Sequence, residues 1–83
     1  MVVLIVGGGK TGSQLASELL AGGHTVVVIE DRQPVVERLQ RELPSEAVVA
    51  GDGSSPSVLE AAGIEKANVL AAVTGDDLSL IHI

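Results

Sequence analysis

Residues 2–12 have the sequence Val-Val-Leu-Ile-Val-Gly-Gly-Gly-Lys-Thr-Gly, and this stretch decides the fold. Its first five side chains are all β-branched or aliphatic. A strand with one solvent-exposed face would instead alternate apolar and polar residues. Continuous hydrophobicity of this kind is typical of a parallel-sheet strand that is covered on both faces. Glycines follow at positions 7, 9 and 12, a spacing at which a strand turns directly into a helix. The stretch therefore predicts a strand, a tight turn and the start of a helix.

After this turn the hydrophobic spacing becomes helical. Between residues 11 and 21, leucine and alanine side chains recur on one helical face, and two glycines then end the helix. Residues 26–29 form a second buried run. Pro34 is expected at the first position of a second helix, and Pro44 ends that helix.

A third crossover follows the same scheme. We expect a short strand at residues 47–50, then a helix with Ser55 as its N-cap and Pro56 at its first position. Gly63 ends this helix, because glycine accepts the left-handed conformation of a helix C-terminus. Residues 69–73 form the fourth apolar run.

Strands that alternate with helices predict an α/β fold with parallel strands. Right-handed crossovers then give the strand order 3-2-1-4, a Rossmann-like doubly wound parallel sheet. Complete domains of this type carry further strands, so we expect a sheet that is incomplete at its C-terminus. Residues 1–77 are accordingly predicted to be a partial dinucleotide-binding domain.

The composition excludes several other classes of protein. Of 83 residues, 46% are hydrophobic and 19% charged, which indicates a globular and not a disordered chain. The net charge of −6 is unlike that of a nucleic-acid-binding protein, and the absence of cysteine excludes disulfides and thiolate metal sites. No aromatic residue is present, so aliphatic side chains must fill the core. No run is long enough for a membrane helix and no signal peptide is recognisable, so we expect a soluble, cytoplasmic chain.

The glycine motif is the first candidate binding element, because ligands of open parallel sheets bind beyond the carboxyl ends of the strands. Gly7 permits the tight turn, Gly9 lets backbone N–H groups approach a pyrophosphate, and Gly12 lets the helix pack close to the strand. The helix N-terminus adds a partial positive charge that faces the phosphates. The alternative is that the three glycines only make a tight turn.

The tripeptide Gly9-Lys10-Thr11 suggests a nucleoside triphosphatase, but the spacing excludes that class. The P-loop pattern needs a glycine five residues before Gly9, and Leu4 occupies that position. Lys10 could still contact a phosphate, or it could be a solvated surface lysine, and the sequence leaves both alternatives open.

Glu30 ends the second apolar run and is the second candidate. A carboxylate there can accept hydrogen bonds from the ribose 2′- and 3′-hydroxyls, and it repels a 2′-phosphate. NAD or an adenine nucleotide is therefore favoured over NADP, although Arg32 could accommodate the extra phosphate. A solvated acid at the end of a strand is the alternative.

The other two loops at this edge offer weaker candidates. Asp52 lies between two glycines, where it could either form a turn through its own backbone or contact an adenine. Thr74 and Gly75 either border the crevice or form an ordinary turn. His24 is expected to be a partly buried turn residue. Because no base, nucleophile or metal-ligand cluster is recognisable, we do not expect an enzyme.

Five segments together resemble the N-terminal nucleotide-binding domain, the RCK or TrkA-N domain, of Trk/Ktr-type potassium-uptake regulatory subunits. The first half of the chain shares its pattern with dehydrogenases, whereas the later segments are more specific. The resemblance covers residues 1–77, and its segments are Val-Gly-Gly-Gly-Lys-Thr-Gly at 6–12, Gly-His-Thr-Val-Val-Val-Ile-Glu at 23–30, Val-Ala-Gly-Asp-Gly at 49–53, Val-Leu-Glu-Ala-Ala-Gly-Ile at 58–64 and Ala-Val-Thr-Gly-Asp-Asp at 72–77.

This resemblance implies a non-catalytic sensor of NAD(H) or ATP/ADP that regulates a membrane potassium transporter or channel. It further implies a homo-oligomer when complete, located in the cytoplasm at the inner membrane face through its transporter partner. The cofactor-binding residues that it implies, together with the motif, are Gly7, Gly8, Gly9, Lys10, Thr11, Gly12, Glu30, Asp31, Gly51, Asp52, Thr74 and Gly75. Glu30 would bind the ribose, Asp52 the adenine, and Thr74 with Gly75 the far side of the crevice.

The last six residues, 78–83, depart from this family, which continues with a polar, Asn-containing helix start. Their sequence, Leu-Ser-Leu-Ile-His-Ile, matches a translated transposon-end adapter used in sequencing libraries. Our hypothesis is that the natural sequence diverges after Asp77 and that this atypical tail is read-through.

Two other functions remain open from the sequence. One is the cofactor-binding half of an NAD-dependent dehydrogenase that lacks its catalytic domain. The other is a module that binds a protein partner and no nucleotide, in which the glycines are purely structural.

Overall fold

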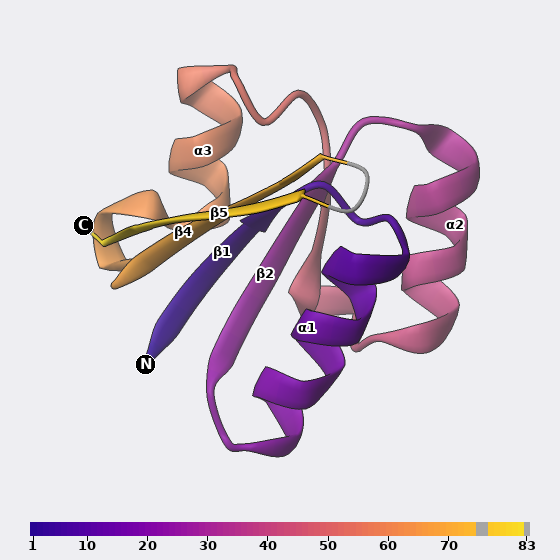
Figure 1. Cartoon of the computed structure of the whole chain (residues 1–83). Helices are drawn as coiled ribbons and strands as arrows, with labels where there is room; N and C mark the ends of the chain where they lie inside the picture. The colour runs from indigo at the N-terminus through magenta and orange to yellow at the C-terminus, as the bar shows by residue number, and fades with distance from the viewer. Residues whose placement is uncertain (75–76, 83) are drawn as a thin grey trace.

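The computed structural model describes residues 1–74 and 77–82 and consists of a single five-stranded sheet with helices on both faces. Figure 1 shows α1 and α2 on one side of the sheet and α3 on the other. The strands are β1 (Val2–Val6), β2 (Thr25–Glu30), β3 (Val48–Ala50), β4 (Val69–Thr74) and β5 (Asp77–His82). The helices are α1 (Lys10–Ala21), α2 (Gln33–Glu42) and α3 (Pro56–Ala62), with short 3-10 turns at Ser45–Ala47 and Ile64–Lys66.

The strand order is β3-β2-β1-β4-β5, and the first four strands run parallel. This confirms the predicted α/β class and the predicted order 3-2-1-4. β1 lies in the centre, with Ile5 in register with Val28 of β2 and Ala71 of β4. A central strand of this kind is covered on both faces, which explains its unbroken hydrophobic sequence.

The sheet contains one strand more than the predicted order 3-2-1-4. β5 pairs antiparallel with β4 along its whole length, from Val69 opposite His82 to Thr74 opposite Asp77. A short connection suffices for an antiparallel neighbour, so no crossover helix is needed between these two strands. β5 lies at the edge of the sheet, and Leu80 and Ile81 remain more than half exposed.

Two hydrophobic clusters fill the two faces of the sheet. Under α1 and α2 lies the larger one, which has Ile5, Val28 and Leu39 at its centre. Under α3 lies a smaller one, built on Leu4 and Ile29. Val, Leu, Ile and Ala make up both clusters, as the absence of aromatic residues requires.

Several element boundaries differ from the prediction by one residue. α2 begins at Gln33, so Pro34 is not the first helical residue, and β3 begins at Val48 because Ala47 belongs to a 3-10 turn. Ser55 does precede α3, but its side chain makes no capping hydrogen bond and its hydroxyl lies 3.0 Å from that of Ser57. Gly63 ends α3 with φ +92°, as predicted.

Among the described residues, no helix combines the length and the apolar character needed to cross a membrane.

Candidate functional site

The carboxyl ends of the parallel strands meet at one edge of the sheet, and the turn from β1 to α1 lies there (Figure 1). Gly7 begins this turn with φ +103°, and its N–H donates to the carbonyl oxygen of Ile29 at 2.8 Å. A Cβ atom at this position would collide with the carbonyl oxygen of Val73. The chain itself therefore requires glycine here, both for the backbone conformation and for the close approach of β4.

Gly12 is required for a different reason. It lies in the first turn of α1, and a Cβ atom there would collide with the carbonyl oxygen of Gly7. The missing side chain lets α1 start directly against the end of β1. This confirms the close helix-to-strand packing that the glycine spacing predicts.

Gly9 differs from these two glycines because nothing in the chain occupies the space beside it. Its backbone is extended, at φ −66° and ψ −169°, and the nearest atom to an added Cβ is Arg32 Nη2 at 3.9 Å. Any residue could adopt this conformation. The open space beside Gly9 is therefore available to a ligand.

Four backbone donors lie at the start of α1, next to Gly9. The first hydrogen bond of α1 runs from Ser13 N–H to the Gly9 carbonyl at 2.9 Å. The N–H groups of residues 9–12 have no hydrogen-bond partner in the part of the chain that the structure describes. They lie at the positive end of a twelve-residue helix, an arrangement that can bind an anion such as a phosphate.

The Gly8 peptide is held from both sides by charged residues. Its N–H donates to Glu30 Oε1 at 2.8 Å, and its carbonyl accepts from Arg38 Nη2 of α2 at 2.7 Å. The Gly8 carbonyl and the Gly9 N–H belong to one trans peptide and point in opposite directions. Arg38 therefore directs the Gly9 N–H away from α2. Arg38 is not among the predicted site residues, because its contact with Gly8 joins residues 30 positions apart in the chain.

Glu30 is almost completely buried, and its carboxylate accepts four hydrogen bonds. Besides Gly8 N–H, the donors are Arg32 N–H at 2.8 Å, Arg32 Nε at 3.0 Å and Arg32 Nη2 at 3.0 Å. The bonds from the Arg32 side chain lower the pKa of Glu30 to about 2 from 4.5, against the opposing effect of burial; the backbone N–H groups of Gly8 and Arg32 also lower this pKa. Glu30 is therefore charged at neutral pH, and it is not a solvated strand-end acid.

A cavity of about 450 Å³ adjoins Glu30 at the same edge of the sheet. It brings together five of the predicted binding residues, Gly7, Glu30, Asp31, Gly51 and Asp52, and its other lining residues are Val6, Ile29, Arg32, Gly53, Ser54 and Val73. The cavity thus has an apolar floor from three strands and a polar rim. Ser54 and the apolar floor were missing from the predicted site.

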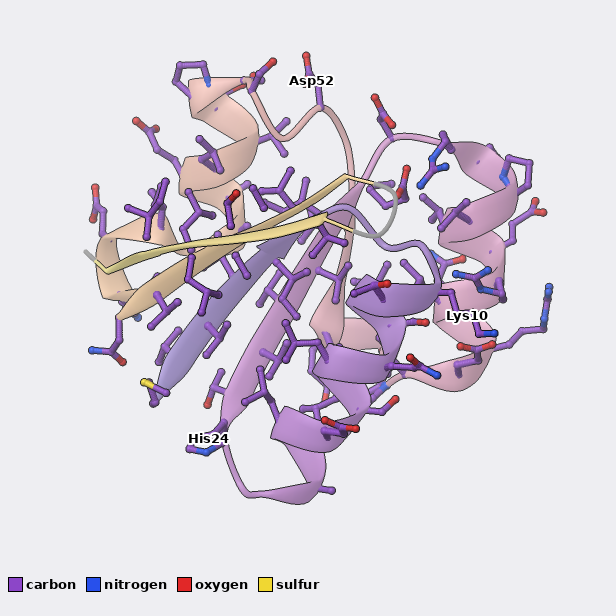
Figure 2. The ribbon with its side chains drawn as sticks, in the orientation of Figure 1. Lys10, His24 and Asp52 are labelled. Atoms are coloured by element: carbon purple, nitrogen blue, oxygen red, sulfur yellow. The ribbon has the colours of Figure 1, made fainter. Side chains whose placement is uncertain are left out.

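Asp52 is exposed, and its carboxylate accepts hydrogen bonds from the N–H of Ser54 at 2.9 Å and its hydroxyl at 2.7 Å. The Ser54 N–H and then its hydroxyl lower the pKa of Asp52. Figure 2 shows Asp52 on the loop between β3 and α3, with its side chain directed outwards. Of the two alternatives for Asp52, the turn role is the one for which the structure supplies contacts.

The remaining predicted residues lie around this centre. Lys10 is exposed and, in the view of Figure 2, extends from the start of α1 towards α2 and away from Asp52. Thr11 is the second residue of α1, and Thr74 is the last residue of β4. Gly75 lies outside the described residues.

His24 lies at the opposite end of the sheet from Asp52 (Figure 2) and is half-buried. It lines a second, smaller cavity of about 310 Å³ together with residues such as Leu20, Pro44 and Glu46. Within residues 1–74 and 77–82, no group of three or more His, Cys, Asp or Glu side chains could hold a metal ion.

The sheet is mostly parallel, a glycine-rich turn leads into a helix whose first N–H groups have no partner among the described residues, and an acid-lined cavity adjoins it. These features are typical of a Rossmann-like domain of the nucleotide-binding type. Comparison with known families identifies the particular one. Residues 3–83 match the TrkA-N domain, and the chain belongs to this family.

Curated relatives carry names that agree with the family. The chain is 39% identical over 77 residues to a "Trk system potassium uptake protein TrkA homolog" of Methanothermobacter thermautotrophicus, which covers 93% of this chain and 35% of that protein. It is 42% identical over 81 residues to the "Trk system potassium uptake protein TrkA" of Streptomyces coelicolor, and this match covers 98% of this chain and 36% of that protein. It is 35% identical to the protein of the same name from Haemophilus influenzae, and this match covers 93% of this chain and 17% of that protein. The chain thus spans about a third or less of these relatives.

Proposed function

We propose that this chain is a nucleotide-binding regulatory domain of a potassium-uptake system, without catalytic activity of its own. The observation that carries the proposal is the set of N–H groups at residues 9–12 that have no partner among the described residues, together with the open space beside Gly9 and the buried Glu30 carboxylate nearby. The names of the relatives support the link to potassium uptake. NAD(H) and ATP/ADP are the ligands that this arrangement suits, since both combine phosphates with an adenosine.

In the proposed complex, the phosphates lie against residues 9–12, with Lys10 and Thr11 at the edge of the phosphate site. The adenosine then extends towards Glu30 and the 450 Å³ cavity, with Asp31, Gly51 and Asp52 at its rim. Thr74, the last residue of β4, would border the opposite side of the crevice. Glu30 binds the ribose, and its negative charge disfavours a 2′-phosphate.

The wider role is part of the same proposal. Residues 1–77 would form the nucleotide-binding domain of a longer, homo-oligomeric regulatory protein. That protein would lie in the cytoplasm and contact a potassium transporter or channel at the inner membrane face. Nucleotide binding would then change the geometry of the oligomer and with it the conductance of the pore.

For residues 78–83 we propose that they do not belong to the natural protein, although residues 77–82 pair as β5 and the match to the TrkA-N domain extends to residue 83. The sequence of the intact gene beyond codon 77 tests this. Natural flanking DNA that encodes the same six residues would contradict it.

Calorimetric titration with NADH and with ATP tests the binding site. Gly9→Val should abolish binding, because its side chain would enter the open space beside Gly9, where an added Cβ meets no atom closer than 3.9 Å. Gly22→Val, at the other end of α1, is the matched control, since Gly22 has φ −81° and an added Cβ there meets its nearest atom at 3.4 Å. Equal affinity of the Gly9→Val variant and the wild type would refute the site.

A further inference from the structure

Arg32 occupies the acceptor positions on Glu30 that a ribose would need. Its Nε and Nη2 atoms each donate to the Glu30 carboxylate at 3.0 Å. A carboxylate offers about four lone-pair positions, and the two backbone N–H groups of Gly8 and Arg32 use the other two. A ribose hydroxyl can therefore donate to Glu30 only if the Arg32 guanidinium leaves.

The two partners of this ion pair differ greatly in their freedom to move. The Glu30 side chain is 2% exposed and is held by the glycine-rich turn, whereas 62% of the Arg32 side chain is exposed. Water can hydrate the exposed Arg32 guanidinium when it leaves Glu30, whereas the buried carboxylate stays in place. Arg32 is thus the partner that can rotate away.

The guanidinium also lies next to the proposed phosphate site. Arg32 Nη2 is 3.9 Å from the position of an added Cβ on Gly9, and so it borders the open space in front of the N–H groups of residues 9–12. A phosphate bound to those groups would lie within reach of the same side chain. Arginine forms strong, often bidentate hydrogen bonds with phosphate.

We propose that Arg32 exchanges partners when a nucleotide binds: ribose hydroxyls take its place on Glu30, and its guanidinium moves to the phosphate of the ligand. This makes Arg32 a specificity-determining residue that favours ribonucleotides carrying phosphate over nucleosides. A nucleoside displaces the guanidinium without offering it a new anionic partner. The inference rests on the proposed function, since it needs a nucleotide in this site.

Titration of the protein with adenosine and with ADP, followed by NMR, tests the exchange. Arg32→Ala should bind adenosine about fivefold more tightly than the wild type, because no guanidinium has to be displaced. The affinity of the same variant for ADP should either fall or rise by less than half of the gain seen with adenosine. The reason is that the contact between Arg32 and the phosphate is lost as well. Arg41→Ala, which removes another exposed arginine from the last turn of α2, should change neither affinity.

Three results would overturn the exchange. Unchanged or weaker adenosine binding to Arg32→Ala would show that Arg32 does not obstruct Glu30. An equal gain for adenosine and ADP would show that Arg32 only obstructs and makes no phosphate contact. If the wild type binds no ADP, the proposed function fails and the exchange fails with it, whereas the first two results leave the proposed function intact.

The Arg32 Nε–H resonance provides an independent measurement in the wild type. It should shift when ADP saturates the protein, since the group leaves Glu30. The Arg32→Gln variant, which keeps a polar side chain, should show the same selectivity change as Arg32→Ala if the protein folds. An Nε–H resonance that ADP leaves in place would contradict the exchange.

Discussion

Two loops at the same edge of the sheet are held in different ways. In the turn at residues 7–12, side chains from the end of β2 and from α2 bind both polar groups of Gly8. In the loop after β3, the Gly51 N–H donates to the Glu30 carbonyl, and among the described residues the Asp52 carboxylate bonds only to Ser54, two positions later. Long-range contacts therefore fix the first loop, whereas mainly local contacts shape the second.

This difference bears on how a nucleotide would bind. A preorganised set of donors loses little conformational freedom on binding and so contributes strongly to affinity. A loop with local contacts can adapt to different bases and adds less. We therefore expect substitutions in the turn to have large effects and substitutions in the loop after β3 to have small ones.

The largest effect is expected from Gly12→Ala. Its methyl group would collide with the Gly7 carbonyl oxygen and force α1 away from β1. We expect a loss of about 3 kcal/mol in the free energy of unfolding, measured by urea denaturation. Gly9→Ala meets no atom closer than 3.9 Å and is the matched control, with an expected change below about 1 kcal/mol. Equal stability of the two variants would show that the turn is looser than described.

The next largest effect concerns Glu30 and pH. The pKa of Glu30 is about 2 in the folded protein, compared with 4.5 for an unperturbed glutamate in the unfolded chain. Its stabilising contribution is therefore complete above pH 4.5. That contribution is lost as the pH falls towards 2, and it amounts to on the order of 2 kcal/mol after allowance for the exposed Arg32. Glu30→Gln should lower the free energy of unfolding by this amount at pH 7 and flatten its fall in acid. The same pH profile for Glu30→Gln and for Glu37→Gln, an exposed acid of α2, would argue against this role.

A smaller effect is expected from Arg38→Ala, which removes the hydrogen bond to the Gly8 carbonyl. The expected loss of stability is about 1 kcal/mol. Nucleotide affinity should fall as well, because the Gly9 N–H is no longer fixed in direction. Arg41→Ala is the control for the loss of one arginine from α2. Calorimetry would contradict the positioning role if Arg38→Ala and Arg41→Ala bound nucleotide equally well.

The smallest effect is expected from Asp52→Ala. Its hydrogen bonds are local and exposed to solvent, so the thermal midpoint should change little and nucleotide affinity should fall less than for Arg38→Ala. A loss of affinity as large as that of Gly9→Val would show that Asp52 is a main contact of the ligand. The contrast between the two loops would then be wrong.

Much of the fold was predictable because the physical signals were local. The unbroken run at residues 2–6 predicts a central strand, and Gly63 marks the end of α3 through its positive φ. β5 was not predicted, because residues 78–83 were interpreted as an atypical tail, although their leucine and isoleucine residues are compatible with a strand. The boundaries at Gln33 and Val48 shifted by one residue, because helix and strand ends depend on contacts outside the local sequence.

The site was predictable only in part. The glycine spacing and Glu30 follow from a local motif, and the structure brings Glu30 next to the turn. The contact of Arg38 with Gly8 joins residues 30 positions apart, and no local pattern encodes it. The same holds for the guanidinium of Arg32, whose position on Glu30 depends on the burial of that carboxylate.

The most direct test of the central claim is an NMR map of the backbone amides in the presence of NADH or ADP. The account predicts large shifts at residues 9–12 and Arg32, smaller shifts at residues 51–54, and none around His24 at the other end of the sheet. No shifts with either ligand, or shifts confined to the cavity beside His24, would contradict it.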